Sequence, residues 1–171
     1  MIKKNDILKI LEKKKIKYTI YEHEPFYTVE DSGKKRSEMK GTHTKNLFLK
    51  NKKNQFVLFS CNENSIVDLK NFSRSIGLKN LSFAKPEYLL EFLGIKPGSV
   101  SPFGLLNDSG NNVEFYLEEV LENSADINFH PLINTSTISL KTKDFIRFMI
   151  ENKKKINIFS LSQNRLLKVY E

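Results

Sequence analysis

Hydrophobic residues along this chain recur with two periods, one typical of helices and the other of strands. Near the N-terminus, Ile7, Leu8 and Leu11 share one helical face, and we expect Asn5 to cap this helix with Asp6 in its first turn. Further helices are predicted to begin at Thr28 or Asp31, at Asp68, at Pro86 and at Thr142.

Alternating apolar and polar residues predict strands between these helices. The segments 45–50 and 55–60 are joined by the polar residues 51–54, which is typical of a hairpin. Other strands are predicted at residues 18–22, 103–106, 113–117, 137–141 and 156–159. Helices and strands interleave without regular βαβ units. We therefore predict one α+β domain over residues 1–160, with a mixed, mostly antiparallel sheet flanked by helices. Residues 161–171 are expected to form a C-terminal tail without an assigned element.

Composition agrees with a single globular domain. The chain has 171 residues, of which 39% are hydrophobic, and 13 phenylalanines supply bulky core material in the absence of tryptophan. The apolar runs are too short for a membrane-spanning helix, and no apolar segment follows the charged start Met1–Asp6. One cysteine and no zinc-like spacing of Cys and His argue against a metal site. We expect a cytoplasmic protein without metal or cofactor.

The net charge of +8 suggests a polyanionic partner, because lysine and arginine neutralise phosphates. The excess consists of 24 lysines against 4 arginines, however, and arginine is the better bidentate phosphate ligand. A lysine-rich and asparagine-rich chain is equally typical of biased codon usage. Charge alone therefore leaves a nucleic-acid partner open.

The segment 41–50 passes abruptly from small polar residues into an alternating apolar run. We expect Lys45 and Asn46 to lie at the mouth of a strand and face a cleft, with Leu47 and Leu49 facing the core. A lysine at a strand entry is often merely solvated. In a site, its ammonium could instead hold a substrate carbonyl or phosphate and stabilise developing negative charge, while the amide of Asn46 can donate and accept hydrogen bonds.

Two later polar loops supply further candidates. Residues 98–102 read Gly-Ser-Val-Ser-Pro, in which glycine permits close backbone approach and proline stiffens the loop. Residues 128–137 contain His130, which could position a water molecule or bind a terminal adenosine, next to Asn134 and Thr135. His43 is a further candidate. Cys61 has no activating neighbour in the sequence, and no serine nucleophile motif is present, so a covalent mechanism lacks a nucleophile.

These three segments, in this order, resemble the YbaK/prolyl-tRNA-synthetase-associated editing domains, and most closely the freestanding deacylases that clear mischarged tRNA(Pro). The resemblance covers about residues 3–160 and implies a YbaK-like fold. It implies catalytic roles for Lys45, Asn46 and His130, and substrate binding by Gly98, Ser99, Val100, Ser101, Pro102, Asn134 and Thr135. The implied partners are the acceptor end of aminoacyl-tRNA(Pro) and, transiently, prolyl-tRNA synthetase.

Two departures from the family pattern concern Ser136, where the family has alanine, and residues 64–66. The latter read Asn-Ser-Ile where related domains often carry basic residues, so the position of acceptor-stem contacts stays open.

The function that we expect is hydrolysis of the ester between alanine and tRNA(Pro), with lysines holding the acceptor stem and the ribose 2′-hydroxyl assisting the attacking water. A pocket that excludes proline by size would complete a double sieve, because binding discriminates weakly against a smaller substrate. Three alternatives remain: a deacylase for another small aminoacyl group, a non-catalytic tRNA-binding module of the same fold, and a small-molecule binding protein. An assay with alanyl-, seryl- and prolyl-tRNA(Pro) separates them.

Overall fold

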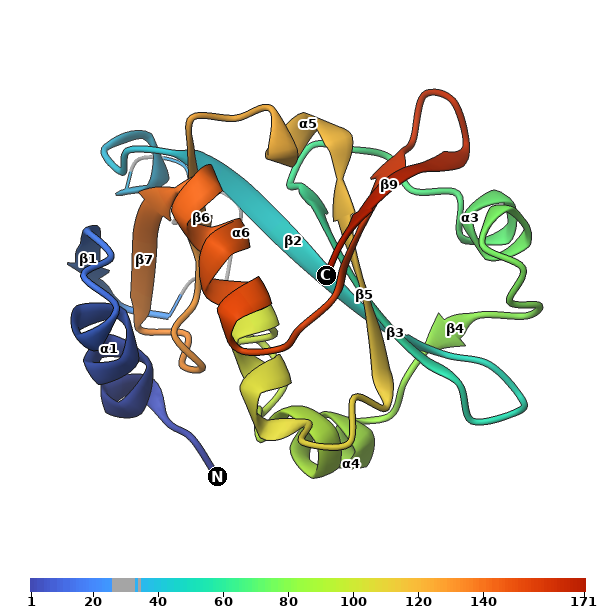
Figure 1. Ribbon diagram of the computed structural model, residues 1–171, viewed down its shortest axis with the longest axis horizontal. Coiled ribbons are helices and arrows are strands. Elements are labelled where there is room, and N and C mark those ends of the chain that lie inside the picture. Colours follow the sequence, from blue (N-terminus) through green and yellow to red (C-terminus); the bar gives the residue numbers. More distant parts are fainter. Residues whose placement is uncertain (26–32, 34) are drawn as a thin grey trace.

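A mixed β-sheet forms the centre of the computed structural model, which describes residues 1–25, 33 and 35–171 (Figure 1). The strand order is β1-β7-β6-β2-β3-β5-β8-β9, and β4 pairs with β2 outside this path. The strands are β1 (Tyr18–Glu22), β2 (Thr42–Lys50), β3 (Phe56–Asn62), β4 (Ser82–Phe83), β5 (Val113–Glu118), β6 (Asp126–Phe129), β7 (Ser136–Lys141), β8 (Ile156–Ser160) and β9 (Arg165–Tyr170). The helix expected at Thr28 or Asp31 lies outside the described residues.

Antiparallel and parallel pairings alternate in blocks across the sheet. The hairpin β2–β3 is antiparallel, as predicted, and so are β1–β7, β6–β7, β2–β4 and β8–β9. The pairings β2–β6, β3–β5 and β5–β8 are parallel. The α+β class with a mixed, mostly antiparallel sheet is therefore confirmed. Strand β2 is the element common to both halves, because it pairs with β6 through Thr42 and His43 and with β3 from Thr44 onward.

The helices begin close to the predicted positions. They are α1 (Lys4–Lys13), α3 (Leu69–Ser75), α4 (Pro86–Tyr88) continued by η1 (Leu89–Leu93), η2 (Pro102–Asn107), α5 (Glu119–Glu122) and α6 (Thr142–Glu151). Asp68 caps α3 by accepting a hydrogen bond of 3.0 Å from the Asn71 N–H, as expected. Within the described residues, no helix is both long enough and apolar enough to cross a bilayer.

Two predicted caps are wrong. Asn5 lies inside α1, because the helix begins earlier: Lys3 is its N-cap, and the Lys3 N–H donates to the Asp6 carboxylate at 2.9 Å. Lys141 is the N-cap of α6, so Thr142 becomes its first residue. The Thr142 hydroxyl is buried and has no hydrogen-bond partner among the described residues.

The two faces of the sheet carry separate hydrophobic clusters. The larger cluster packs one face against α1, the α4–η1 segment, η2 and α6, and includes Phe48, Phe103 and Phe129. The smaller cluster packs the opposite face against α3 and includes Phe59 and Phe72, whose rings stack at 4.5 Å. Figure 1 shows α6 in front of the sheet and α3 at the end away from α1. Residues of β2 therefore alternate between two differently covered faces.

Several segments differ from the sequence predictions, among them β4 and α5, for which no element was predicted. Residues 103–106 form part of η2, not a strand, because Pro102 and the Ser101 hydroxyl, which accepts from the Phe103 N–H at 3.3 Å, start a helical turn there. Residues 126–129, whose second half was assigned to a polar loop, form β6. Residues 165–170, left without an element in the expected tail, form the edge strand β9 on β8.

Candidate active site

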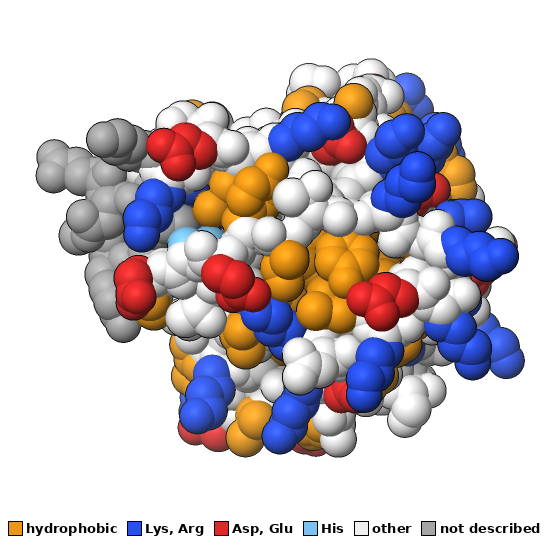
Figure 2. Space-filling view, turned by 90° about the vertical axis from the view of Figure 1, so that its left-hand side faces the viewer, with side chains coloured by type: hydrophobic (Ala, Val, Ile, Leu, Met, Phe, Trp, Pro, Cys, Tyr) orange, Lys and Arg blue, Asp and Glu red, His pale blue; other side chains and the backbone are white. Residues whose placement is uncertain are grey.

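A narrow polar cleft lies where β2, β6 and the start of β7 meet. It offers about 20 Å³ to a water-sized molecule, enough to hold one water. Its lining comprises Arg36, His43, Thr44, Asn46, Asn128, Phe129, His130 and Thr137. Figure 2 shows histidine exposed beside the residues that are not described, among acidic, basic and hydrophobic side chains. Two of the predicted catalytic residues, Asn46 and His130, thus share one cleft.

His130 follows the last residue of β6 and is held in a single tautomer. Its Nδ1 lies 2.7 Å from the carbonyl oxygen of Ser136, and because a carbonyl can only accept, Nδ1 carries the proton. The Nε2 lone pair has no donor among the described residues. Burial lowers the pKa of His130 below its ordinary value, against the opposing effect of the Ser136 hydrogen bond. At neutral pH the ring is therefore uncharged and can accept a proton.

Asn46 lies within β2 and turns toward the same cleft. Its Oδ1 accepts a hydrogen bond of 2.5 Å from the hydroxyl of Ser60, its antiparallel partner on β3. With Oδ1 turned toward Ser60, Nδ2 is the end of the amide that points away from this contact. The Nδ2 group has no acceptor among the described residues, so Asn46 offers N–H donors to a ligand.

Lys45 lies on the opposite face of β2 from Asn46. It pairs with Cys61, on the face of the smaller hydrophobic cluster, and its ammonium donates to the carbonyl oxygen of Ser65. The expectation that Lys45 and Asn46 face one cleft is wrong. The strand begins at Thr42, earlier than expected, so the two neighbours alternate as strand residues do. The catalytic role of Lys45 stays a prediction.

The loop of residues 98–102 has an exposed start and a buried end. Gly98 is exposed with φ +94°, Val100 is half-buried, and Ser99, Ser101 and Pro102 are buried. The Ser99 hydroxyl donates to the Lys96 carbonyl at 3.1 Å, and that of Ser101 caps η2. Both hydroxyls are thus occupied. The N–H group of Val100, which is half-buried, has no acceptor among the described residues, so the backbone of this loop can donate to a substrate at this residue.

The loop of residues 98–102 lies next to the segment after His130. A Cβ atom placed on Gly98 would be 3.8 Å from Nδ2 of Asn134. Asn134 and Thr135 form the turn before β7, and the Thr135 carbonyl accepts a hydrogen bond of 2.9 Å from the His23 N–H. The predicted substrate-binding loops are therefore neighbours, although Gly98 and Asn134 do not line the cleft itself.

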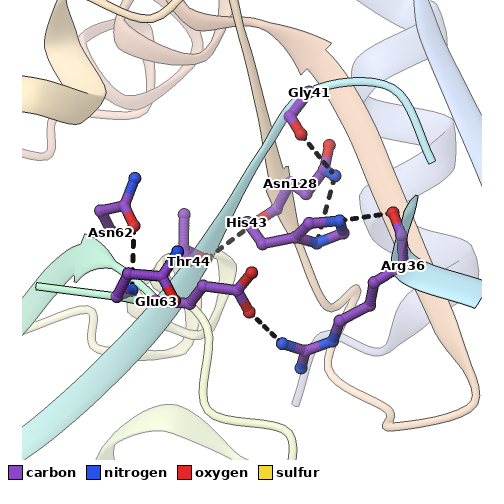
Figure 3. Close-up of polar contacts among 8 residues, drawn as sticks. Arg36, Gly41, His43, Thr44, Asn62, Glu63 and Asn128 are labelled. Atoms are coloured by element: carbon purple, nitrogen blue, oxygen red, sulfur yellow. Dashed lines mark hydrogen bonds and ion pairs between the residues drawn. The ribbon is translucent and has the colours of Figure 1, made fainter. Parts of the chain in front are cut away.

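Sequence reasoning missed a network around Arg36 and Asn128, drawn in Figure 3. His43 Nε2 donates to the carbonyl of Arg36 at 2.9 Å, and its Nδ1 lies 3.4 Å from the amide nitrogen of Asn128. The hydroxyl of Thr44 donates to the carbonyl of Asn128 at 2.7 Å. Arg36 forms an ion pair with Glu63. His43 was a candidate from the sequence, but no sequence signal indicated that these residues meet.

We expect that Cys61 can be replaced without loss of activity, because of its environment. The side chain is fully buried, and burial raises the pKa of its thiol to about 12, with Glu118 adding to the rise and Lys45 opposing it. A thiol that stays protonated is not a nucleophile. Cys61→Ser should fold and deacylate within a few-fold of wild type in a single-turnover assay. Loss of activity in the folded variant would contradict this expectation.

Comparisons with known proteins agree with this arrangement. The aminoacyl-tRNA editing domain matches residues 23–148. The chain is 35% identical to the prolyl-tRNA editing protein ProX of Acetoanaerobium sticklandii over 150 residues, covering 87% of this chain and 92% of that protein. It is 32% identical to the prolyl-tRNA synthetase associated domain-containing protein 1 of Danio rerio over 152 residues, covering 88% and 83%.

The fold matches solved structures as well. One, described as that of a candidate trans-editing enzyme for prolyl tRNA synthetase, superposes with a TM-score of 0.66 over 96% of both chains at 18% identity. At 18% sequence identity, this structural similarity shows a shared fold and nothing further. The matched domain spans most of the chain and includes the whole cleft, from Arg36 to Thr137. The chain belongs to the aminoacyl-tRNA editing domain family.

Proposed function

We propose that this protein is a trans-editing deacylase that hydrolyses the ester between an amino acid, alanine in the first place, and mischarged tRNA(Pro). Membership of the editing family and the naming of the relatives as prolyl-tRNA editing proteins support this class of reaction. The observation that carries the proposal is the neutral His130, whose Nε2 is open beside the amide of Asn46 in a cleft that can hold one water.

The proposed chemistry needs a placed water and help for the oxyanion. His130 Nε2 accepts a proton from the attacking water, directly or through the ribose 2′-hydroxyl. The carbonyl oxygen of the ester then becomes negatively charged. Proposed donors for it are the Asn46 amide and the N–H group of Val100, each such donor being worth roughly 3 kcal/mol. The proton on His130 finally passes to the departing 3′-oxygen.

Selectivity for alanine over proline is proposed to come from exclusion by size. Pro102 and Ser101 are buried at the base of the loop, where Phe103 packs edge-on against Phe129 at 6.1 Å. A wall anchored in this packing cannot yield to the larger pyrrolidine ring at low cost. Attraction cannot select alanine, because a pocket large enough for proline also admits alanine.

Lys45 belongs to the proposal as an electrostatic contributor. Among the described residues its ammonium contacts one hydrogen-bond acceptor, the Ser65 carbonyl, where β2 and β3 diverge. To meet the developing negative charge, the ammonium has to release that carbonyl, because it lies on the face of β2 opposite Asn46. We expect Lys45→Ala to lower single-turnover deacylation roughly 100-fold. A near-normal rate in the folded variant would remove Lys45 from the mechanism.

The tRNA acceptor stem is proposed to contact a basic groove beside α3. The groove has a volume of about 580 Å³ and is lined by Lys70, Arg74 and Lys79 together with neutral residues. It lies on the face of the sheet to which Lys45 points. Cations around a concave surface suit a phosphate backbone. The partner is the acceptor end of aminoacyl-tRNA(Pro), with transient contact to prolyl-tRNA synthetase in the cytoplasm.

Deacylation assays with alanyl-, seryl- and prolyl-tRNA(Pro) test the proposed function. Hydrolysis of alanyl-tRNA(Pro) with little effect on prolyl-tRNA(Pro) is expected. Preferred hydrolysis of seryl-tRNA(Pro) would keep the reaction and change the substrate. Binding of all three without hydrolysis would identify a non-catalytic tRNA-binding module, and absence of both binding and hydrolysis would overturn the proposal.

A further inference from the structure

The hydroxyl of Ser136 belongs to a closed polar triad with Lys4 and Glu22. It accepts a hydrogen bond of 2.7 Å from the Lys4 ammonium and donates one to the Glu22 carboxylate, while Lys4 and Glu22 form an ion pair at 2.5 Å. The hydrogen bonds from Lys4 and Ser136 lower the pKa of Glu22 below its ordinary value, so the carboxylate is ionised at neutral pH. The carbonyl of the same Ser136 accepts from His130 Nδ1. Ser136 therefore connects the triad directly to the proposed base.

Three elements meet at this triad. Lys4 is the first residue of α1, Glu22 the last of β1 and Ser136 the first of β7, and Figure 1 shows α1 and β1 beside β7. Glu22 and Ser136 are directly opposite each other in the β1–β7 pair. Ser136 follows a turn, and the ends of an element fray more readily than its centre. The contacts of the fully buried Ser136 therefore hold this strand end against β1 and α1, in addition to the backbone pairing.

The larger hydrophobic cluster, and not Lys4, docks α1 on the sheet. Ile7 and Leu11 of this helix are fully buried in that cluster. Lys4 lies in the first turn, where the helix dipole disfavours a cation, and an ion pair with an exposed glutamate adds little to stability. Its ammonium nevertheless contacts Ser136, with the side chain only 21% exposed. The contacts of Lys4 thus contribute to the position of Ser136 more than to the helix.

We infer that Lys4, Glu22 and Ser136 position His130 for deacylation, an inference that rests on the proposed function. By fixing the strand end, the triad keeps the Ser136 carbonyl where it receives Nδ1–H, which leaves Nε2 free to accept a proton. The three residues act through the ring of His130 and are therefore positioning residues. The matched editing domain begins at residue 23, and Lys4 and Glu22 precede it. The segment before that domain thus contributes to the geometry of the site.

Kinetics of Lys4→Met test this role, because methionine keeps the unbranched stem and removes the ammonium. We expect kcat on alanyl-tRNA(Pro) to fall roughly 5- to 50-fold, since a misplacement of about 1 Å can cost about 100-fold. KM should stay within about twofold, because no contact to the substrate is removed. Ser136→Ala should cause a similar loss of kcat. The double variant should lose little more than either single variant, since both changes act through one hydroxyl.

The tautomer of His130 gives a readout that does not depend on activity. The ring-nitrogen NMR signals of the ¹⁵N-labelled protein report which nitrogen carries the proton. In the wild type the proton should be on Nδ1, as the Ser136 carbonyl requires. In Lys4→Met and Ser136→Ala, part of the population should carry it on Nε2, because the carbonyl is no longer held in place. A residue that only supports the helix would leave this distribution unchanged.

Lys14 is the matched control, because it forms the ion pair at the other end of α1. It contacts Glu151 of α6 at 2.8 Å, and its side chain is 25% exposed, close to the 21% of Lys4. Glu151 does not line the cleft. Lys14→Met should therefore leave kcat within about twofold and the His130 tautomer unchanged. Lys4→Arg keeps the charge and should recover part of the lost kcat.

Equal effects of Lys4→Met and Lys14→Met, or a wild-type rate and tautomer in folded Lys4→Met, would overturn the inference and leave the triad a structural feature. If Ser136→Ala does not fold, Glu22→Gln replaces it, and it should lower kcat in the same way. If the wild type deacylates neither alanyl-, seryl- nor prolyl-tRNA(Pro), the proposed function fails, and the catalytic part of the inference fails with it. The NMR comparison then still decides whether the triad sets the tautomer of His130.

Discussion

His130→Ala is expected to lower single-turnover deacylation of alanyl-tRNA(Pro) by roughly 100- to 10 000-fold, the range for loss of a general base. The reason is geometric. The Ser136 carbonyl fixes the proton of His130 on Nδ1, so the lone pair of Nε2 faces the cleft. Among the described residues that line the cleft, Glu and Asp are absent, and Arg36 cannot accept a proton.

The pH dependence gives a second readout for His130. Burial lowers its pKa below the ordinary histidine value of about 6.5. The base form therefore predominates at neutral pH, and activity is lost only as the pH falls through this lowered pKa. A profile of kcat/KM should show an acid limb below about pH 6.5, since this parameter reports the free enzyme. The residual activity of His130→Ala should lack that limb.

Two further variants distinguish a base from a structural histidine. Asparagine at this position keeps an N–H donor for the Ser136 carbonyl but has no acceptor at the place of Nε2, so His130→Asn should be as inactive as His130→Ala. His23 is the control, because its ring lies 6.1 Å from that of His130 and its nitrogens contact the Glu24 carbonyl and the Thr137 hydroxyl. His23→Ala should cost only a few-fold. Wild-type activity in folded His130→Asn would contradict the role as base.

The fold was largely predictable because local signals and tertiary packing agree. The polar turn 51–54 joins two alternating runs, and the structure forms the β2–β3 hairpin there. The errors fall where local and tertiary preferences differ. Phe103 and Leu105 are buried in η2 and could equally have faced inward from a strand, so hydrophobicity alone could not decide. The edge strand β9 has mostly exposed residues and no apolar alternation that would indicate a strand.

The candidate site was predictable in part. The resemblance brought together Asn46 and His130, which are 84 positions apart in the sequence and share a cleft. It could not place Lys45. Strand β2 begins at Thr42, so Lys45 and Asn46 both lie within the strand and their side chains point to opposite faces of the sheet. Arg36 and Asn128 were missed for another reason. The contacts of Asn128 depend on the parallel pairing of β2 with β6, and those of Arg36 depend on the approach of Glu63, after β3. No local pattern specifies either.

Gly41 supports the same cleft, and Gly41→Ala is expected to lower the free energy of unfolding by about 2–6 kcal/mol. Gly41 has φ +99°, a conformation that costs an L-residue about 1–3 kcal/mol. A Cβ atom would lie 2.4 Å from Oδ1 of Asn128 and 2.9 Å from Oγ of Ser139, both buried. Forcing these side chains apart adds about 1–3 kcal/mol for overpacking. Urea unfolding monitored by circular dichroism measures the change.

Gly77 separates the two contributions to this cost. It also has a positive φ, +75°, but an added Cβ would meet no atom within 4 Å. Gly77→Ala should therefore show only the backbone cost, about 1–3 kcal/mol. The additional loss of unfolding free energy in Gly41→Ala, compared with Gly77→Ala, measures the clash. This difference should shrink in an Asn128→Ala background, because the nearest atom, Oδ1 of Asn128, is then gone. Asn128 lines the cleft, so Gly41→Ala should also reduce deacylation. Equal destabilisation by the two glycine substitutions would show that close packing against Asn128 does not set the conformation at Gly41.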